Sequence, residues 1–368
     1  MRIGFDGKRA VQNFTGLGNY SRYVADILCH FYPENDYVLY APKKRENKRM
    51  NLLTGQYRQL TLAYPATSFW KKLSSLWRVW GITSQLEKEG IELFHGLSNE
   101  LPLNIHKSRI KSIVTIHDLI FLRYPQYYQS IDRKIYTYKF RKACENADKI
   151  IAISECTKRD IIRYFNIPDD QIEVDYQGCD VSFTHPVTEE KKEEVRKKYQ
   201  LPDHYILNVG SIEERKNILA AVQALPMLPQ HIHIVIVGRR TGYTEKVEQF
   251  IKDNGLGERV HIISNVPFND LPAFYQSAEI FVYPSRFEGF GIPIIEALYS
   301  GIPVVAATGS CLEEAGGPDS IYVNPDDITG LADAFKQIYS NSDKRKNMVE
   351  KGREFAKRSS EKQQSEEI

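Results

Sequence analysis

The chain has 368 residues, of which 42% are hydrophobic and 26% are charged, and its formal net charge is +2. The composition is that of a globular protein, the length favours two domains, and the balanced charge excludes the broadly basic surface of a typical nucleic-acid-binding protein. Five scattered cysteines without a C-x-x-C pair, and no signal-like or membrane-length apolar run, indicate reduced thiols and a cytoplasmic protein.

Short apolar runs alternate with helical stretches through the first half of the chain. Several of the runs are apolar on both faces, which is typical of strands in a buried parallel sheet. Strands are predicted at 2–6, 37–41, 92–96, 112–118, 149–154 and 172–178. The helices between them include 132–146 and 155–165.

The alternation breaks at 182–188, a short polar segment with a proline, and a charged helix follows at 189–199. The pattern predicts two doubly wound, Rossmann-like α/β domains, 1–182 and 183–352, and a helical tail, 353–368, for which a course back to the first domain is one option. Ligands of such domains bind at the carboxyl ends of the strands, so we expect the site in a central cleft that both domains face. The later strands are predicted at 205–211, 233–238, 260–264, 279–285, 303–307 and 321–325.

The stretch FEGFGIPIIEALYSG follows a predicted strand and opens a helix. Glu288 is expected on the loop, Pro293 and Glu296 in the first helical turn, and Gly301 at the helix end. Gly291 lets the backbone approach a ligand, and the N–H groups of the helix start form an anion site. Two interpretations remain: a phosphate on the amides with a sugar and a ribose on the two carboxylates, or a strand-turn-helix whose glutamate is stabilised by the helix dipole.

A second loop, NVGSIEERKN, carries Arg215 and Lys216 just before a helix that Asn217 could cap. Two cations on a loop that faces the cleft would neutralise a diphosphate leaving group as its negative charge develops. The alternative is a pair of solvated loop charges.

Near the N-terminus, FTGLGNYSR places Gly16 and Gly18 before a helix and half-matches the dinucleotide fingerprint. Asp36 precedes the second strand instead of ending it, which weakens a nicotinamide interpretation. His117 ends a strand, where a lone histidine is more often satisfied by a backbone carbonyl than functional. Asp118 could orient His117 or cap the next helix.

All three tryptophans lie in FWKKLSSLWRVWGI (69–82), with lysines and an arginine between them. Helical spacing places Trp70 and Trp77 on one face with Leu73 beside them. The first interpretation is a core-facing amphipathic helix with basic flanks. The alternative is an interfacial helix that touches anionic lipid, where tryptophan and lysine are favoured.

Five ordered blocks resemble those of the retaining family 4 glycosyltransferases with the GT-B fold. The resemblance covers nearly the whole chain and implies two Rossmann-like domains that face a cleft. The blocks are TIHDLIFLRYP (115–125), ADKIIAISECTKRDI (147–161), NVGSIEERKN (208–217), LPAFYQSAEIFVYPSRFEGFGIP (271–293) and the E-x7-E segment FEGFGIPIIEALYSGIPVVA (287–306).

The resemblance also implies roles for single residues. Glu288, His117, Arg215 and Lys216 would be catalytic, with His117 facing the donor sugar and the two cations facing the leaving diphosphate. Ser211 stands where the family often has an arginine, whose work Arg215 would take over. The donor-binding residues implied are Gly16, Gly18, Gly210, Ser211, Val266, Phe290, Gly291, Ile292, Pro293 and Glu296.

The implied activity is the retaining transfer of a hexose from a nucleoside-diphosphate sugar to a glycan or lipid-linked glycan, in polysaccharide biosynthesis. The IEERKN block looks more like the mannosyl-type members, which makes GDP-mannose the first donor and a UDP-sugar the alternative. No D-x-D, the pair with which many glycosyltransferases hold a divalent metal, occurs in the chain, so neither a metal nor another cofactor is expected. An oxidoreductase and a nonenzymatic sugar-nucleotide-binding protein are the rival functions. Lipid-linked acceptors would favour peripheral contact of 69–82 with the inner face of the membrane.

Overall fold

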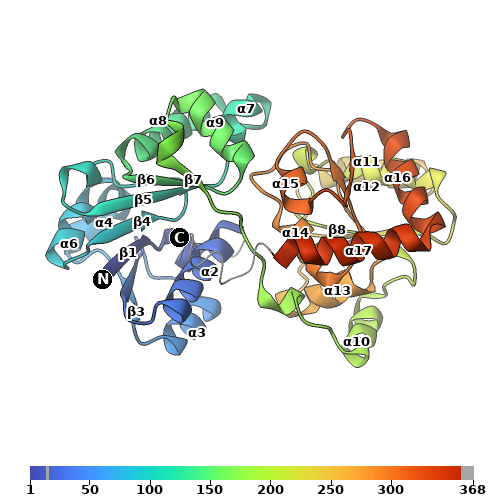
Figure 1. Ribbon diagram of the computed structural model, residues 1–368, viewed down its shortest axis with the longest axis horizontal. Coiled ribbons are helices and arrows are strands. Elements are labelled where there is room, and N and C mark those ends of the chain that lie inside the picture. Colours follow the sequence, from blue (N-terminus) through green and yellow to red (C-terminus); the bar gives the residue numbers. More distant parts are fainter. Residues whose placement is uncertain (14–15, 358–368) are drawn as a thin grey trace. The chain divides into compact units, whose positions relative to one another are not determined.

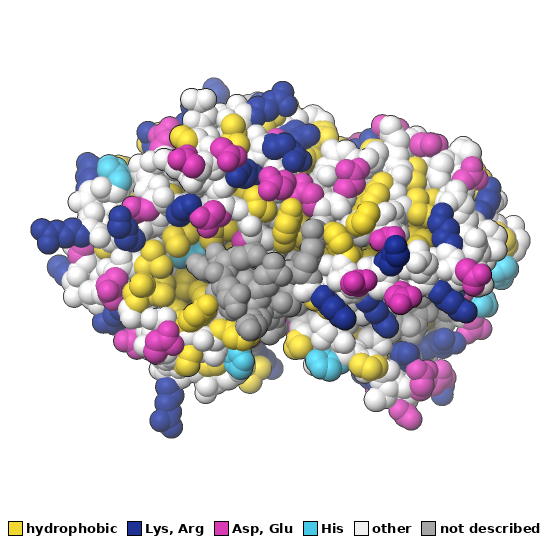
Figure 2. Space-filling model, viewed as in Figure 1, with side chains coloured by type: hydrophobic (Ala, Val, Ile, Leu, Met, Phe, Trp, Pro, Cys, Tyr) yellow, Lys and Arg dark blue, Asp and Glu magenta, His cyan; other side chains and the backbone are white. Residues whose placement is uncertain are grey.

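Figure 1 shows the computed structural model of the protein, in which residues 1–13 and 16–357 are described. The described residues form two compact units, 1–177 and 178–357. Each unit is built on its own parallel sheet with helices, so the prediction of two Rossmann-like α/β domains is confirmed. Acidic and basic side chains are interspersed over the face shown in Figure 2, in keeping with the small net charge.

The sheet of the N-terminal unit has, within the described residues, seven parallel strands in the order β3-β2-β1-β4-β5-β6-β7. The order reverses between β1 and β4, and such a switch point is where doubly wound domains bind ligands. β3 was not predicted, because this short edge strand is mostly half-exposed and lacks a continuous apolar run. The strands are β1 (Arg2–Asp6), β2 (Asp36–Tyr40), β3 (Leu60–Ala63), β4 (Leu93–Gly96), β5 (Lys111–Ile116), β6 (Lys149–Ala152) and β7 (Ile172–Val174).

Two hydrophobic clusters sandwich this sheet. Tyr37 and Leu39 of β2 enter one cluster, whereas Val38 and Tyr40 enter the other, because successive strand residues point to opposite faces. The other strands, the helices and the loops of the unit supply the rest of both clusters. The helices are α1 (Lys8–Gln12), α2 (Gly16–Phe31), α3 (Lys48–Gln56), α4 (Ser68–Lys72), α5 (Ser74–Leu76), α6 (Ile82–Lys88), α7 (Ile120–Arg123), α8 (Ser130–Asn146) and α9 (Glu155–Phe165), with a π-helical turn at Trp77–Gly81.

The sheet of the C-terminal unit has, among the described residues, six parallel strands in the order β10-β9-β8-β11-β12-β13. Its switch point lies between β8 and β11, the two strands that precede the loops singled out in the sequence. The strands are β8 (Tyr205–Val209), β9 (His233–Val237), β10 (Val260–Ile263), β11 (Ile280–Tyr283), β12 (Val304–Ala307) and β13 (Ile321–Val323). The helices are α10 (Glu189–Tyr199), α11 (Ile218–Ala224), α12 (Thr244–Asp253), α13 (Leu271–Ser277), α14 (Ile292–Ser300), α15 (Leu312–Gly316), α16 (Ile328–Ser340) and α17 (Ser342–Ala356).

The last described helix, α17, packs on α14 within the C-terminal unit. The Tyr299 hydroxyl of α14 donates a hydrogen bond to the carbonyl of Ala356, at 2.9 Å. The first residues of the predicted tail therefore belong to this unit. Residues 358–368 lie outside the described residues, and the predicted course of the tail stays a prediction.

Candidate active site

The start of α14 is built as the sequence predicts. Gly291, just before the helix, has φ of +133°, a conformation that L side chains rarely adopt. Pro293 is the second helical residue, where its missing N–H removes no hydrogen bond. The N-cap residue, Gly291, provides no side-chain cap, Pro293 has no N–H, and the N–H of Ile294 donates to the carbonyl of Gly291 at 2.8 Å. Of the first three helical residues, only Ile292 could therefore offer its N–H to an anion.

Glu288 lies on the loop between β11 and α14 and binds both predicted cations. Its Oε2 lies 2.8 Å from Arg215, and its Oε1 lies 3.0 Å from Nζ of Lys216. The hydroxyls of Tyr283 and Ser285 also donate to Oε1, at 3.2 and 2.9 Å. The structure therefore brings three of the four predicted catalytic residues together.

The charges in this cluster stabilise one another. Burial alone would raise the pKa of Glu288, but Lys216 and Arg215 outweigh it and lower that pKa to about 2. Burial would lower the pKa of Lys216, and Glu288 raises it instead. All three groups are therefore charged near neutral pH, with one positive charge in excess to receive an anion.

The loop after β8 differs from the prediction at Asn217. Asn217 precedes α11, yet its side chain donates to the carbonyl of Pro325, at 2.8 Å, and does not cap the helix. Arg215 contacts Glu288 directly and lies 3.7 Å from Glu213, whose carboxylate accepts the Ser211 hydroxyl at 2.6 Å. Within this loop, Lys216 and Arg215 thus contact Glu288, whereas Ser211 contacts Glu213.

Glu296 is the fifth residue of α14 and lies just past the first helical turn, in which it was predicted to lie. Its carboxylate accepts a hydrogen bond from the Tyr275 hydroxyl, at 2.6 Å. Burial raises the pKa of Glu296 to about 7; Tyr275 lowers it and Asp180 adds to the rise. A carboxylate held in so unfavourable a place is a candidate for ligand binding.

Glu296→Gln is expected to stabilise the free protein above pH 7 and to weaken nucleotide binding. The folded protein keeps Glu296 protonated up to about pH 7, whereas the unfolded chain ionises it near the ordinary 4.5, so its contribution to stability declines as the pH rises between these values. We expect the substitution to raise the free energy of unfolding by on the order of 2 kcal/mol at pH 8. This is less than the full pKa shift implies, because the side chain is partly exposed.

Thermal unfolding from pH 4 to 8 measures this effect, and calorimetry measures the affinity for a nucleoside diphosphate. The matched control is Glu245→Gln, which removes an exposed carboxylate of α12. Equal pH profiles for Glu296→Gln and the wild type would contradict the buried-carboxylate argument, and unchanged nucleotide affinity would contradict the ribose role.

The remaining predicted donor residues of this unit lie at the carboxyl ends of its strands. Gly210 follows β8 with φ of +153°, and a Cβ there would lie 3.3 Å from Nζ of Lys216. Val266 is half-buried on the loop after β10, and Ile292 is half-buried at the start of α14. Phe290 is buried, and its carbonyl accepts the Cys311 thiol at 2.9 Å.

The glycines near the N-terminus lie in the first turn of α2, not before the helix as predicted. A Cβ on Gly18 would lie 2.0 Å from the carbonyl oxygen of Asn13, so packing alone requires this glycine. A Cβ on Gly16 would meet nothing within 4 Å. A donor-binding role for either glycine stays a prediction.

His117 lies in the N-terminal unit with both ring nitrogens partnered. Its Nε2 lies 2.9 Å from the carbonyl of Leu97 and its Nδ1 lies 3.3 Å from the amide of Gln177. Burial lowers its pKa to about 4, so the ring is neutral at pH 7. Asp118 accepts a hydrogen bond from the backbone N–H of Ile120, the first residue of α7, at 3.1 Å, but the N-cap position is Leu119 and has no side-chain cap. The role of His117 toward a sugar stays a prediction.

The tryptophan segment is not one helix, because the chain breaks at Leu73 between α4 and α5. Trp77 is fully buried and Trp70 packs against the core, which fits the core-facing interpretation. Leu73, expected beside them, is 40% exposed. Other large apolar side chains stay exposed on this segment and on α8: Phe69, Leu76, Trp80, Ile131, Ile135 and Tyr138.

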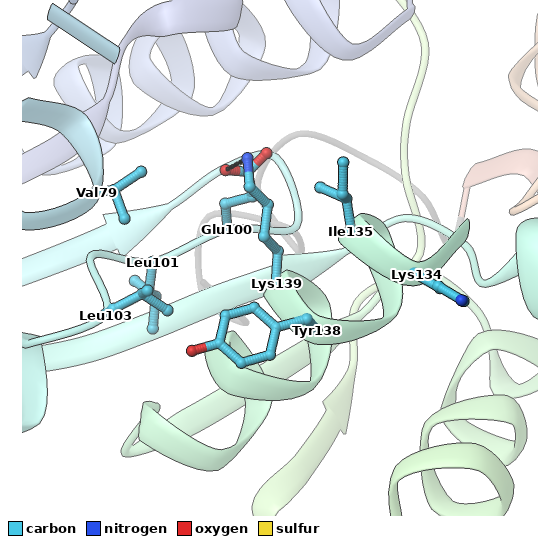
Figure 3. Close-up of a pocket in the computed structure, with 8 residues that line it drawn as sticks. All are labelled: Val79, Glu100, Leu101, Leu103, Lys134, Ile135, Tyr138 and Lys139. Carbon is cyan, nitrogen blue, oxygen red and sulfur yellow. Dashed lines mark hydrogen bonds and ion pairs between the residues drawn. The ribbon is translucent and has the colours of Figure 1, made fainter. Parts of the chain in front are cut away.

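A pocket of about 410 Å³ separates these two exposed segments in the N-terminal unit (Figure 3). Glu100 on its wall binds Lys139 at 3.3 Å and Arg78 at 2.7 Å. The pocket is lined by Val79, Glu100, Leu101, Leu103, Lys134, Ile135, Tyr138 and Lys139. It therefore pairs apolar walls with lysine side chains.

The sequence patterns did not predict three residues of the site, Tyr283, Ser285 and Tyr275. Tyr283 and Ser285 are polar residues at the carboxyl end of a predicted strand, next to the motif, and that position was a usable signal. Tyr275 comes from α13, and no sequence spacing relates it to Glu296.

The described part of the chain lacks two features, a clustered metal site and a membrane-spanning helix. Residues 1–13 and 16–357 hold no group of three or more histidine, cysteine or acidic side chains arranged to bind a metal ion. Among these residues, no helix combines the length and apolar composition needed to cross a membrane.

Two family models match the chain one after the other. The model described as Glycosyltransferase Family 4 matches residues 21–183, and the model described as Glycosyl transferases group 1 matches residues 191–355. Together they match most of both units and every block quoted above. The chain belongs to the family 4 glycosyltransferases.

Curated relatives of this family 4 chain include two O-antigen mannosyltransferases. O-antigen chain mannosyltransferase B of Escherichia coli is 31% identical over 65% of the chain and 63% of its own length. O-antigen chain mannosyltransferase RfbU of Salmonella typhimurium is 28% identical over 61% of the chain and 60% of its own length. The chain thus matches about three fifths of the length of these two relatives.

Solved structures confirm the GT-B fold of this family 4 chain. Anabaena HepE in complex with UDP and glucose superposes with a TM-score of 0.77 at 17% identity, over 100% of this chain and 97% of that one. Sucrose-phosphate synthase from Thermosynechococcus elongatus superposes with a TM-score of 0.76 at 20% identity, over 97% of this chain and 94% of that one. At these identities the likeness concerns the fold alone.

Proposed function

We propose that the protein transfers a mannosyl residue from GDP-mannose to a hydroxyl of a glycan or lipid-linked glycan, with retention at the anomeric carbon. The observation that carries the proposal is the cluster of Glu288, Arg215 and Lys216 beside the uncapped start of α14. The names of the O-antigen relatives support the mannosyl choice.

In the proposed reaction, the bond from the anomeric carbon to the diphosphate breaks and a bond to the acceptor oxygen forms on the same face. The acceptor proton passes to an oxygen of the leaving diphosphate, so no enzymatic nucleophile is needed. Negative charge grows on the diphosphate as its bond breaks. Fixed cations that are already in place stabilise such charge without reorganisation, and Arg215 and Lys216 supply them.

Glu288 keeps both cations ordered, and the N–H of Ile292 at the start of α14 would donate to a phosphate. Glu296 would accept the two ribose hydroxyls, because a carboxylate offers an acceptor oxygen to each. The backbone near Gly210 and Val266 would contact the base.

A thermal-shift series with GDP, UDP, ADP and dTDP tests the donor, followed by transfer or hydrolysis assays with the matching nucleotide sugars. A ligand at 100 times its Kd stabilises the folded state by about 2.7 kcal/mol, so the preferred base should stand out. NMR of the product anomer tests retention. If no nucleotide raises the melting temperature and no nucleotide sugar is turned over, the proposal is overturned.

A UDP-sugar is the second candidate donor, since the similarly folded HepE was solved with UDP and glucose. A larger shift with UDP than with GDP would favour it over the first.

The proposal extends to a peripheral membrane contact of the acceptor side. Exposed apolar side chains on 69–80 and on α8, with Lys71, Lys72 and Lys134 near them, resemble an interfacial surface. Cosedimentation with anionic but not zwitterionic vesicles supports this contact, and cosedimentation with neither contradicts it.

A further inference from the structure

We propose that Tyr283 is a positioning residue that holds the ammonium group of Lys216 in place for the leaving diphosphate. The inference rests on the proposed function and deepens it. Neither the sequence motif nor the family resemblance assigned this tyrosine a role.

Tyr283 ends β11 and is only 2% exposed. Its hydroxyl oxygen accepts a hydrogen bond from Nζ of Lys216, at 2.8 Å, and its hydrogen is donated to Oε1 of Glu288, at 3.2 Å. Lys216 also donates to the same carboxylate oxygen, at 3.0 Å. The three side chains thus form a closed triangle in which every hydrogen bond has a proper donor and acceptor.

The triangle sets the direction in which Lys216 can act. A lysine carries a compact charge on a flexible four-carbon stem and has three N–H donors. Two of them bind Tyr283 and Glu288, so the tetrahedral geometry of the ammonium fixes the direction of the third. A fixed third N–H is what a developing charge requires, since a misplacement of about 1 Å can reduce a rate about a hundredfold.

Tyr283 suits this task because its own position is rigid. It belongs to a central strand, where it is paired in register with Ala306 of β12. Its ring stacks on Phe281, at 5.9 Å between centroids, and lies 5.1 Å from Nζ of Lys216. The hydroxyl therefore transmits the geometry of the sheet to the end of a long, mobile side chain.

Tyr283→Phe tests the inference, because it removes the hydroxyl and keeps the ring with its packing and its attraction for the ammonium. We expect kcat to fall about tenfold to a hundredfold, the loss typical of one hydrogen bond to a charged group, while KM for the donor changes less than about threefold. The matched control is Tyr205→Phe: this buried tyrosine of β8 donates to the carbonyl of Phe274, at 2.6 Å, and does not touch the cluster.

A double-mutant cycle separates positioning from a general structural effect. If Tyr283 acts through Lys216, adding Tyr283→Phe to Lys216→Ala should lower the residual rate less than about twofold. An equal loss in both backgrounds would show an independent role and overturn the inference. So would a kcat of Tyr283→Phe within twofold of the wild type, or an equal loss in Tyr205→Phe.

The two proposals fail in distinguishable ways. An active wild type with an unimpaired Tyr283→Phe overturns the positioning role and leaves the proposed function standing. A wild type that turns over no nucleotide sugar overturns the proposed function and the positioning role together.

Discussion

Glu288→Gln is expected to lower turnover about 100- to 1000-fold, the usual loss for one positioned group that stabilises the transition state. Affinity for the free nucleoside diphosphate should stay equal or increase. The reason is that Arg215 and Lys216 lose their anionic partner and attract a diphosphate more strongly. Initial rates and calorimetry with the same protein preparation measure both quantities.

The same substitution should lower stability, because removing one partner of a buried ion pair leaves charge uncompensated, at about 3 to 5 kcal/mol. Glu214→Gln is the matched control, since this exposed carboxylate lies next to Arg215 in the 3-10 helix Glu214–Lys216. Wild-type turnover together with weakened nucleotide binding would place Glu288 at the nucleotide and away from the reacting bond.

Wild-type transfer is expected to survive excess EDTA, whereas Lys216→Ala should lose about 100- to 1000-fold in rate and should not recover with added magnesium. A divalent ion and a pair of fixed cations meet the same electrostatic need, the charge that builds on the leaving group. Here Lys216 would stabilise that charge, and its Nζ is held by Oε1 of Glu288 at 3.0 Å. Arg215→Ala should also be impaired, since Arg215 contacts Glu288 where Ser211 does not.

Initial rates against chelator and magnesium, for the wild type and both variants, decide the matter. Lys252→Ala, which removes an exposed lysine of α12, controls for the loss of one positive charge. Abolition of wild-type transfer by EDTA, with recovery on adding a divalent ion, would show that the charge-stabilising group has been assigned wrongly.

The sequence predicted those parts of the site that depend on local patterns. Gly291 and Pro293 mark the turn from β11 into α14, and Gly301 marks the end of that helix, all within one short stretch. Arg215 and Lys216 could be placed because they follow a strand with a clear apolar run. The edge strand β3 was not predicted, because this half-exposed strand lacks a continuous apolar run.

The contacts between segments could not be predicted. The bond from Tyr275 to Glu296 and the triangle around Lys216 join residues that only the packing of several elements brings together. A motif can mark Glu288 as functional, but it does not show that two cations, a phenol and a serine hydroxyl share its two oxygens. In the tryptophan segment, Leu73 does not share the buried face of Trp70 and Trp77 as predicted, because the helix breaks at Leu73 between α4 and α5.

The raised pKa of Glu296 makes nucleotide binding a proton-exchange reaction. At pH 7 about half of the free protein carries a proton on this carboxyl group, and a ribose that donates two hydrogen bonds requires that proton to leave. The heat of binding should then depend on the ionisation enthalpy of the buffer, and acidification should oppose donor binding. Through Glu296, the occupancy of the donor site would respond to the pH of its surroundings before any chemistry occurs.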